Sequence, residues 1–119
     1  MSKYKSQKIT IDNHKFDSKV EADYYLFVKD LKEKGYIASI ELQPKFLLQE
    51  KFTKGKKKYR DMFYIADFLL TFSNGRQVII DIKGLPTEVA ILKRKLFDYR
   101  YKDLRLIWLK KKKKRWVSI

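Results

Sequence analysis

The clearest hydrophobic pattern in the chain is a pair of apolar runs separated by a short polar turn. The runs cover residues 62–72 and 76–84 and flank Ser73-Asn74-Gly75. Such a pattern predicts a β-hairpin. Three charged residues interrupt the runs, and they are Asp67, Asp81 and Lys83. Because a charge buried in a strand costs free energy unless a partner compensates it, these residues are candidates for chemistry.

The length of the turn decides which residues of the hairpin face each other. A two-residue loop places Asp67 opposite Ile82, whereas a three-residue loop with Gly75 in the left-handed conformation places Asp67 opposite Asp81. We favour the second register because Lys83 then shares the face of both carboxylates. In that register the other face is an almost continuous apolar layer, made of Met62, Tyr64, Ala66, Phe68, Leu70, Phe72, Val78, Ile80 and Ile82.

Two carboxylates facing each other across a strand pair are normally destabilising. Together with a lysine two residues further on, they suit a magnesium-dependent phosphodiesterase. The carboxylates would bind a hard cation, the cation would activate water and polarise a phosphate, and the lysine would stabilise developing charge or hold the nucleophile. The same spacing also fits an exposed strand face whose charges have no such role.

A first helix is predicted from about residue 16 to residue 34. Ser18 is a good N-cap, and Gly35 is a C-terminal signal. The predicted buried face consists of Val20, Tyr24, Phe27, Val28 and Leu31. Glu21 stands three residues after Ser18, so the local pattern favours a capping box for Glu21.

A second helix is predicted over residues 88–102, with Thr87 as its cap. Its predicted buried face consists of Val89, Leu92, Leu96, Phe97 and Tyr99. Lys93 lies inside this face, roughly 40° from Val89. Lys93 must therefore either contact an anion near the hairpin or extend its ammonium to water.

Four further strands are predicted, at residues 9–11, 37–49, 104–109 and 116–119. The segment 37–49 is either one strand or a bent pair that breaks near Pro44. Gln43 is either an exposed strand residue or a donor to a phosphate or a metal-bound water. His14 is predicted to be a surface turn residue.

Composition narrows the choice of chemistry. The chain has 119 residues, which suggests a single domain, and its 29 basic against 14 acidic residues give a formal charge of +15. This excess indicates a polyanionic partner. Without cysteine and with His14 as the only histidine, the chain has neither a thiolate nor a histidine metal site. A metal would be bound by oxygens, which favours Mg²⁺, with Mn²⁺ as the other option.

The basic residues gather in an N-terminal arm (1–8), a loop (51–60) and a C-terminal segment (110–119). Candidate DNA contacts are Lys54, Lys56, Lys57, Lys58, Arg60, Lys95, Lys110, Lys111 and Lys112. Alternatively, the lysine runs are simply exposed to solvent, as such runs commonly are. The aromatic residues of the loop can stack on unpaired bases. No run reaches the roughly 20 apolar residues of a membrane span, and no signal-peptide core is present. We therefore expect a soluble cytoplasmic protein without a membrane partner.

The predicted elements follow one another in the order helix, strand, hairpin, helix, strand, and three motifs stand in the first helix and on the two strands of the hairpin. They are Phe16-Asp17-Ser18-Lys19-Val20-Glu21-Ala22, Tyr64-Ile65-Ala66-Asp67-Phe68 and Asp81-Ile82-Lys83-Gly84, followed by Lys93. From about residue 16 to residue 109 the chain resembles the PD-(D/E)XK nuclease superfamily. More closely, it is similar to small phage-encoded members long described as a domain of unknown function and related to phage Holliday-junction resolvases.

The resemblance implies an α/β fold with a restriction-endonuclease-like core (α-β-β-β-α-β), in which helices flank a mixed central sheet, over a single domain at 1–119. It also implies metal binding by Asp67 and Asp81, assistance by Glu21, catalysis by Lys83 and an auxiliary basic role for Lys93. Ala66 stands where the superfamily usually has proline. The resemblance thereby changes the expected role of Glu21 from a helix cap to a residue at or beside the metal.

The expected function is a Mg²⁺-dependent endonuclease of branched or Holliday-junction DNA, acting in DNA recombination in the bacterial host cytoplasm if the chain is phage-encoded. The resemblance also implies a homodimer, since a two-fold pair suits the cutting of two opposed strands of a junction. Two alternatives stay open. One is a non-catalytic DNA-binding or architectural protein, and the other is a nuclease of linear or single-stranded DNA.

Overall fold

A computed structural model describes residues 8–119, so the N-terminal arm predicted at 1–8 lies outside the described residues apart from Lys8. The described chain forms two helices and eleven strands. In chain order these are β1 (Ile9–Ile11), β2 (His14–Phe16), α1 (Lys19–Glu33), β3 (Ile37–Leu42), β4 (Lys45–Gln49), β5 (Phe52–Lys54), β6 (Lys57–Tyr59), β7 (Met62–Ile65), β8 (Phe68–Phe72), β9 (Gln77–Ile82), α2 (Glu88–Arg100), β10 (Leu106–Lys112) and β11 (Arg115–Ser118). No helix among these residues is long and apolar enough to cross a bilayer.

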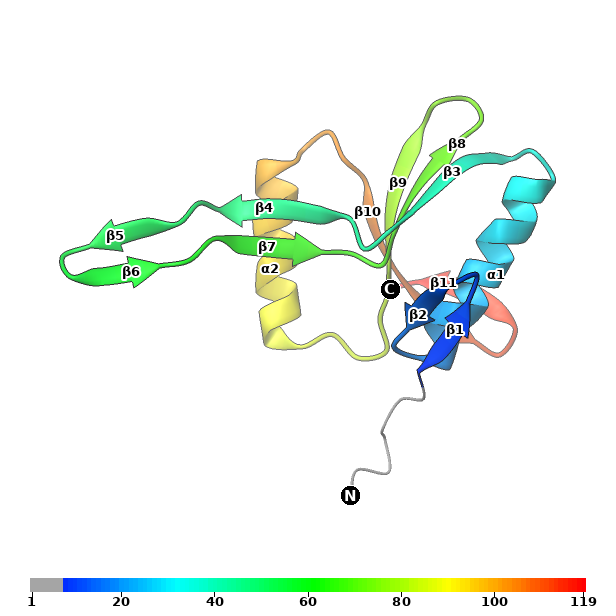
Figure 1. Cartoon of the computed structure of the whole chain (residues 1–119), viewed down its shortest axis with the longest axis horizontal. Coiled ribbons are helices and arrows are strands. Elements are labelled where there is room, and N and C mark those ends of the chain that lie inside the picture. The colour runs from blue at the N-terminus through cyan, green and yellow to red at the C-terminus, as the bar shows by residue number, and fades with distance from the viewer. Residues whose placement is uncertain (1–7) are drawn as a thin grey trace, which may run out of the picture.

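The centre of the molecule is a mixed sheet of five strands in the order β11-β10-β9-β8-β3. Neighbouring strands are antiparallel except β9 and β10, which run parallel and are connected through α2. The other strands form two-stranded ribbons, of which β4–β7 extends into β5–β6 away from the sheet (Figure 1). The predicted mixed α/β fold, with a central sheet and two helices, is confirmed.

The helices cover opposite faces of this sheet, because alternate residues of a strand point to opposite sides. Val78 and Ile80 of β9 pack in the cluster that contains Val28 of α1. Ile79, which lies between them in sequence, packs in the second cluster with Phe97 of α2. Each face of the sheet therefore has its own apolar core, and the central strands lie between the two cores.

The predicted hairpin register is confirmed. Phe68 pairs with Ile80 and Thr71 with Gln77. The Phe72 N–H donates to the Arg76 carbonyl at 2.8 Å, and Gly75 has a φ of +90°, as a three-residue loop requires. Continuing this register by one residue places Asp67 opposite Asp81.

The prediction of one continuous strand over residues 62–72 is wrong. The chain bends at Ala66 and Asp67, which separates β7, paired with β4, from β8, paired with β3 and β9. Ala66 donates its N–H to the carbonyl of Pro44, and Asp67 donates to the carbonyl of Ile80. The strand therefore changes partners at the residue that carries the first carboxylate.

The predicted continuous apolar layer is wrong for the same reason. Tyr64 and Ala66 pack in the cluster that contains α2, whereas Phe68 and Leu70 pack in the cluster that contains α1. The bend at Asp67 reverses which face of the ribbon points to which helix.

Both helix caps are confirmed, and the buried helix faces are partly wrong. The Ser18 hydroxyl accepts the Glu21 N–H at 3.2 Å, and the Thr87 hydroxyl accepts the Ala90 N–H at 3.1 Å. The exposed side chains that were predicted to be buried are Val20, Phe27, Val89, Leu92 and Tyr99. On α2 the side chain that enters the core is Phe97, because the helix packs mainly against the β4–β7 ribbon.

Three segments differ from the predicted elements. The loop at 51–60 is a hairpin of β5 and β6, closed by Gly55 at a φ of +61°. His14 lies in β2, paired with Ile11, and is not a turn residue. The strand predicted to end at Leu109 continues through Lys112, because β11 pairs with its lysines. The bent strand pair around Pro44 is confirmed as β3 and β4.

Candidate active site

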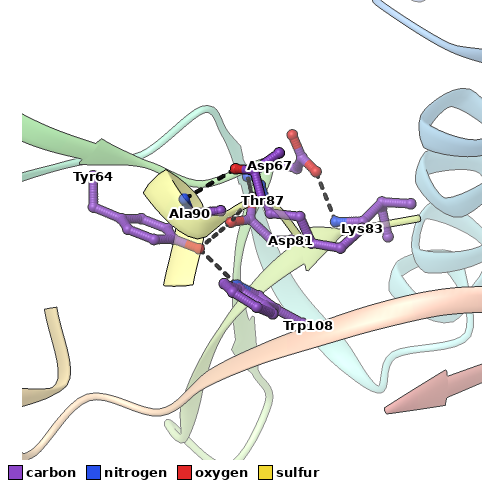
Figure 2. Close-up of polar contacts among 8 residues, drawn as sticks. Tyr64, Asp67, Asp81, Lys83, Thr87, Ala90 and Trp108 are labelled. Carbon is purple, nitrogen blue, oxygen red and sulfur yellow. Dashed lines mark hydrogen bonds and ion pairs between the residues drawn. The ribbon is translucent and has the colours of Figure 1, made fainter. Parts of the chain in front are cut away.

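Asp81 forms the buried base of the candidate site and is only 2% exposed. Its Oδ1 accepts the backbone N–H of Asp67 at 2.8 Å, and its Oδ2 accepts the hydroxyl of Tyr64 (Figure 2). The Lys83 Nζ lies 4.0 Å from the same Oδ2 and is about one-third exposed, at 32%. Asp81 is thus fixed on both oxygens, with a cation beside it that still reaches solvent.

Tyr64 is itself held in place by a second buried side chain. The Trp108 Nε1 donates to the Tyr64 hydroxyl at 2.8 Å, so that the hydroxyl lies between Trp108 and Asp81 (Figure 2). Arg94 of α2 covers the Trp108 ring at 4.9 Å and donates to the Leu106 carbonyl at 2.8 Å. Sequence analysis missed the role of Tyr64, Trp108 and Arg94. The available signal was the polar end of each buried aromatic, which must find a hydrogen-bond partner.

Asp67 lies at the bend between β7 and β8. Its Oδ2 accepts the Ile82 backbone N–H at 2.7 Å, a donor left without a strand partner by the bend. Asp67 also lines a pocket of about 200 Å³ together with Glu21 and Gln43. The other residues around this pocket are Asn13, His14, Lys15, Phe16, Leu42 and Phe68. The bend therefore places one carboxylate between the buried Asp81 and an open pocket.

Burial of the carboxylates in the site costs electrostatic free energy, which appears as raised pKa values. The pKa of Asp67 is raised to about 7, mainly by burial, with a smaller contribution from the charges of Asp81 and Glu21 and opposition from the Ile82 N–H and Lys83. Burial likewise raises the pKa of Asp81, opposed by the Tyr64 hydroxyl and by Lys83. Burial and the charge of Asp17 raise the pKa of Glu21. A bound cation would relieve this cost, which is the physical reason to consider a metal here.

The structure brings together Glu21, Asp67, Asp81 and Lys83 among the predicted catalytic residues, since their charges act on one another. Lys93 is half-buried on α2. The α2 cation that lowers the pKa of Asp81 is its neighbour Arg94.

Gln43 belongs to the candidate site and is not an ordinary strand residue. It sits between β3 and β4 at a φ of +52°, and its N–H donates to the Asp67 carbonyl at 3.0 Å. His14 and Lys15 were missed because only the pairing of β2 with β1 brings them to the pocket.

A magnesium ion fits the donors that are present, although within residues 8–119 no three acidic, histidine or cysteine side chains are grouped closely enough to form a complete metal cage. Magnesium is commonly held by one or two carboxylates, with water and substrate oxygens completing its coordination. Asp67 and Asp81 are adjacent oxygen donors with raised pKa values. Glu21, across the pocket, would act directly or through water.

The candidate DNA contacts occupy three parts of the molecule. Lys54, Lys56, Lys57, Lys58 and Arg60 lie exposed on or beside the β5–β6 hairpin, and Lys95 is exposed on α2. Lys110 and Lys112 are exposed on β10, whereas Lys111 between them forms an ion pair with Asp23 at 3.2 Å. Lys111 is therefore less available to a phosphate than its neighbours.

Comparison with known proteins gives one result for nearly the whole chain. No curated protein and no solved structure matches it. A family model described as a protein of unknown function (DUF1064) matches residues 1–116. The chain therefore belongs to the DUF1064 family, whose members are described as proteins of unknown function.

Proposed function

We propose that this protein is a magnesium-dependent DNA endonuclease of branched DNA, similar to Holliday-junction resolvases. The observation that carries the proposal is the meeting of Asp67 and Asp81 at the bend between β7 and β8, with Lys83 beside them. One buried and one half-buried carboxylate, both with raised pKa values, lie beside a solvent-accessible ammonium, and such clusters of perturbed groups are concentrated at functional sites.

The order of elements supports a restriction-endonuclease-like core. The two helices and four of the five central strands follow one another as α1-β3-β8-β9-α2-β10. This is the α-β-β-β-α-β order that the resemblance implies. Of the core strands, β3, β8 and β9 form an antiparallel meander and β10 adds parallel to β9. In this proposal β1, β2, β4–β7 and β11 are additions around that core.

When bound, Mg²⁺ or Mn²⁺ would supply an activated water and neutralise charge on the phosphate. Asp67 and Asp81 would hold the ion, and Glu21 would complete or support its coordination across the pocket. Tyr64 keeps Asp81 oriented through its hydroxyl. The Lys83 ammonium, 4.0 Å from Asp81, orients the attacking water and stabilises the charge that develops on the phosphate. Gln43 and Lys15 face the same pocket and can donate to phosphate oxygens. Lys93 contacts the phosphate near the cut.

The test is cleavage of synthetic four-way, flap, linear-duplex and single-stranded DNA, with Mg²⁺ and with chelator. We expect Mg²⁺-dependent cutting of branched substrates by the wild-type protein. Asp81→Ala should bind the same DNA and lose cleavage by about 10³-fold or more, because charge stabilisation at the reacting phosphate is lost. Asp103→Ala, which changes an exposed acid outside the site, is the matched control. Equal cleavage by wild type and Asp81→Ala would remove the proposal.

A second candidate is a DNA-binding or architectural protein without catalysis. The formal charge of +15 favours it as much as it favours a nuclease. Both candidates predict steeply salt-dependent binding, so salt does not separate them. Tight binding of four-way DNA without any cutting in Mg²⁺ or Mn²⁺ would favour the second candidate.

A further inference from the structure

The segment 51–60, here named the β5–β6 arm, projects from the body of the molecule as the end of the β4–β7 ribbon (Figure 1). The cations of this arm are Lys51, Lys54, Lys56, Lys57, Lys58 and Arg60, and the segment contains no acidic residue. Every one of its residues is exposed. The arm is thus the most concentrated positive feature of the described chain that lies away from the sheet.

The charges of the arm are not neutralised within the described residues. None of the arm cations forms an ion pair within residues 8–119. Lys54 and Lys57 face each other directly across the two strands, where like charges destabilise a hairpin. The nearest acids in sequence are engaged at the base: Asp61 accepts the Lys51 backbone N–H at 2.6 Å, and Glu50 lies 4.0 Å from Arg100. The unneutralised cations of the arm therefore favour the binding of an external anion.

The arm is already formed in the free protein. The rings of Phe52 and Tyr59 stack across the strands, with centroids 4.4 Å apart and planes 7° from parallel. The Lys57 Nζ lies 4.9 Å from the centre of the Tyr59 ring. Aromatic cross-strand pairs stabilise a ribbon that has no helix to pack against. A partner would therefore meet a preformed two-stranded ribbon rather than a loop that must order on binding.

We infer that the β5–β6 arm lies in the major groove of duplex DNA at a distance from the candidate active site. A two-stranded ribbon fits the roughly 12 Å width of the major groove. Alternation puts Lys54 and Lys57 on one face of the ribbon and Lys58 on the other, so the phosphates of both groove walls are within reach of lysines. The inference rests on the proposed function only for the identity of the ligand as DNA, and it adds a second contact away from the cut.

The first test compares two charge-matched triple variants in chelator, where cleavage is not required. Lys54→Gln/Lys56→Gln/Lys57→Gln removes charge at the arm tip and leaves the aromatic pair intact. Lys32→Gln/Lys34→Gln/Arg76→Gln removes the same charge around the end of α1 and the β8–β9 turn. For a linear duplex of about 30 base pairs, we expect the arm variant to bind at least about tenfold more weakly and to lower the salt slope by about 2–3, with smaller changes in the control.

The second test locates the contact. Guanine N7 faces the major groove, so methylation of N7 by dimethyl sulfate reports occupancy of that groove. We expect the wild-type protein to protect guanines in a duplex and the arm variant to lose that protection. Circular dichroism melting of each variant checks that the fold is retained.

Equal affinity losses in both triple variants, or N7 reactivity that the wild-type protein leaves unchanged, would overturn the inference. A loss confined to single-stranded DNA would also overturn it and would assign the arm to stacking on unpaired bases through Phe52 and Tyr59. If no substrate is cleaved but the arm effects appear, the endonuclease proposal fails and the groove contact stands. If DNA is cleaved but the arm effects do not appear, the endonuclease proposal stands and the groove contact fails.

Discussion

At the scale of single residues, the site carries a cost that only a ligand would offset. Asp67 and Asp81 are adjacent, and burial raises the pKa of both. Their hydrogen bonds to Ile82, Tyr64 and the Asp67 amide fix their positions without neutralising their charge. Keeping such a pair lowers the free energy of unfolding, and such a loss of stability is common at functional sites.

The cost predicts how the metal-free protein responds to pH. The pKa of Asp67 is about 7 in the folded protein against an ordinary value of 3.8, so between these pH values the folded chain holds a proton that the unfolded chain has released. Stability from this group is therefore full below about pH 4 and is lost as the pH rises through about 7. Asp67→Asn should raise the free energy of unfolding in chelator at about pH 8 by on the order of 1–4 kcal/mol, and the thermal midpoint with it, and should raise both much less at about pH 4.

The measurement is thermal unfolding by circular dichroism at both pH values, with Asp103→Asn as the control for a general charge effect. Added Mg²⁺ should stabilise the wild-type protein more than Asp67→Asn. A lower midpoint for Asp67→Asn at the higher pH would contradict the argument.

Tyr64 is a positioning residue, because it acts on the phosphate only through Asp81. Tyr64→Phe keeps the ring but leaves the Trp108 N–H and one Asp81 oxygen without their buried partner. We expect a loss of stability of about 1–3 kcal/mol and a higher Mg²⁺ concentration for half-maximal cleavage. Tyr99→Phe, on an exposed side chain, should change neither quantity.

Urea unfolding and a Mg²⁺ titration of cleavage measure the two effects of Tyr64→Phe separately. A purely structural role for Tyr64 would lower stability while leaving the Mg²⁺ dependence as in the wild-type protein.

At the scale of elements, α2 presents an apolar stripe to solvent. Val89, Leu92 and Tyr99 are 64%, 56% and 74% exposed and recur at helical spacing on one side of the helix. The face of α2 that packs inward carries Phe97 instead. An exposed stripe of this kind is typical of a helix that packs on a partner. We propose this stripe of α2 as the interface of the predicted homodimer.

Leu92→Gln tests this interface. In light scattering, we expect the mass of a monomer for the variant at concentrations where the wild-type protein gives the mass of a dimer. The thermal midpoint of the monomeric protein should not change. Leu26→Gln, on an exposed position of α1, is the matched control and should leave the dimer intact. The same mass for the wild-type protein and Leu92→Gln would exclude α2 as the interface.

At the scale of the whole molecule, the carboxylate site and the strongest positive projection are separate. The site lies where the ends of the central strands meet the pocket lined by β2, α1 and Gln43, and the β5–β6 arm extends away from the sheet (Figure 1). A formal charge of +15 makes the approach to a polyanion favourable at long range, but position decides which contact each cation makes. We propose that the arm holds DNA at one place while the site acts at another.

Features that depend on neighbours along the chain could be predicted from the amino-acid pattern. The helix starts followed from the caps Ser18 and Thr87, which hydrogen bonds over three residues decide. The hairpin register followed from the choice between a two- and a three-residue loop, which the shared face of the charged residues resolved. The excess of basic residues and the absence of cysteine are properties of composition alone.

The surfaces that meet in the folded chain could not be predicted from the pattern of residues. The bend at Asp67 and the exposure of Val89, Leu92 and Tyr99 on α2 depend on packing between distant segments. The contacts of Tyr64 with Asp81 and Trp108 join residues up to 44 positions apart. Such contacts depend on which strands pair and on the side of the sheet that each helix covers. A strand that changes partners halfway along its apolar run keeps buried side chains in both halves, so the hydrophobic pattern alone does not show the change of partner.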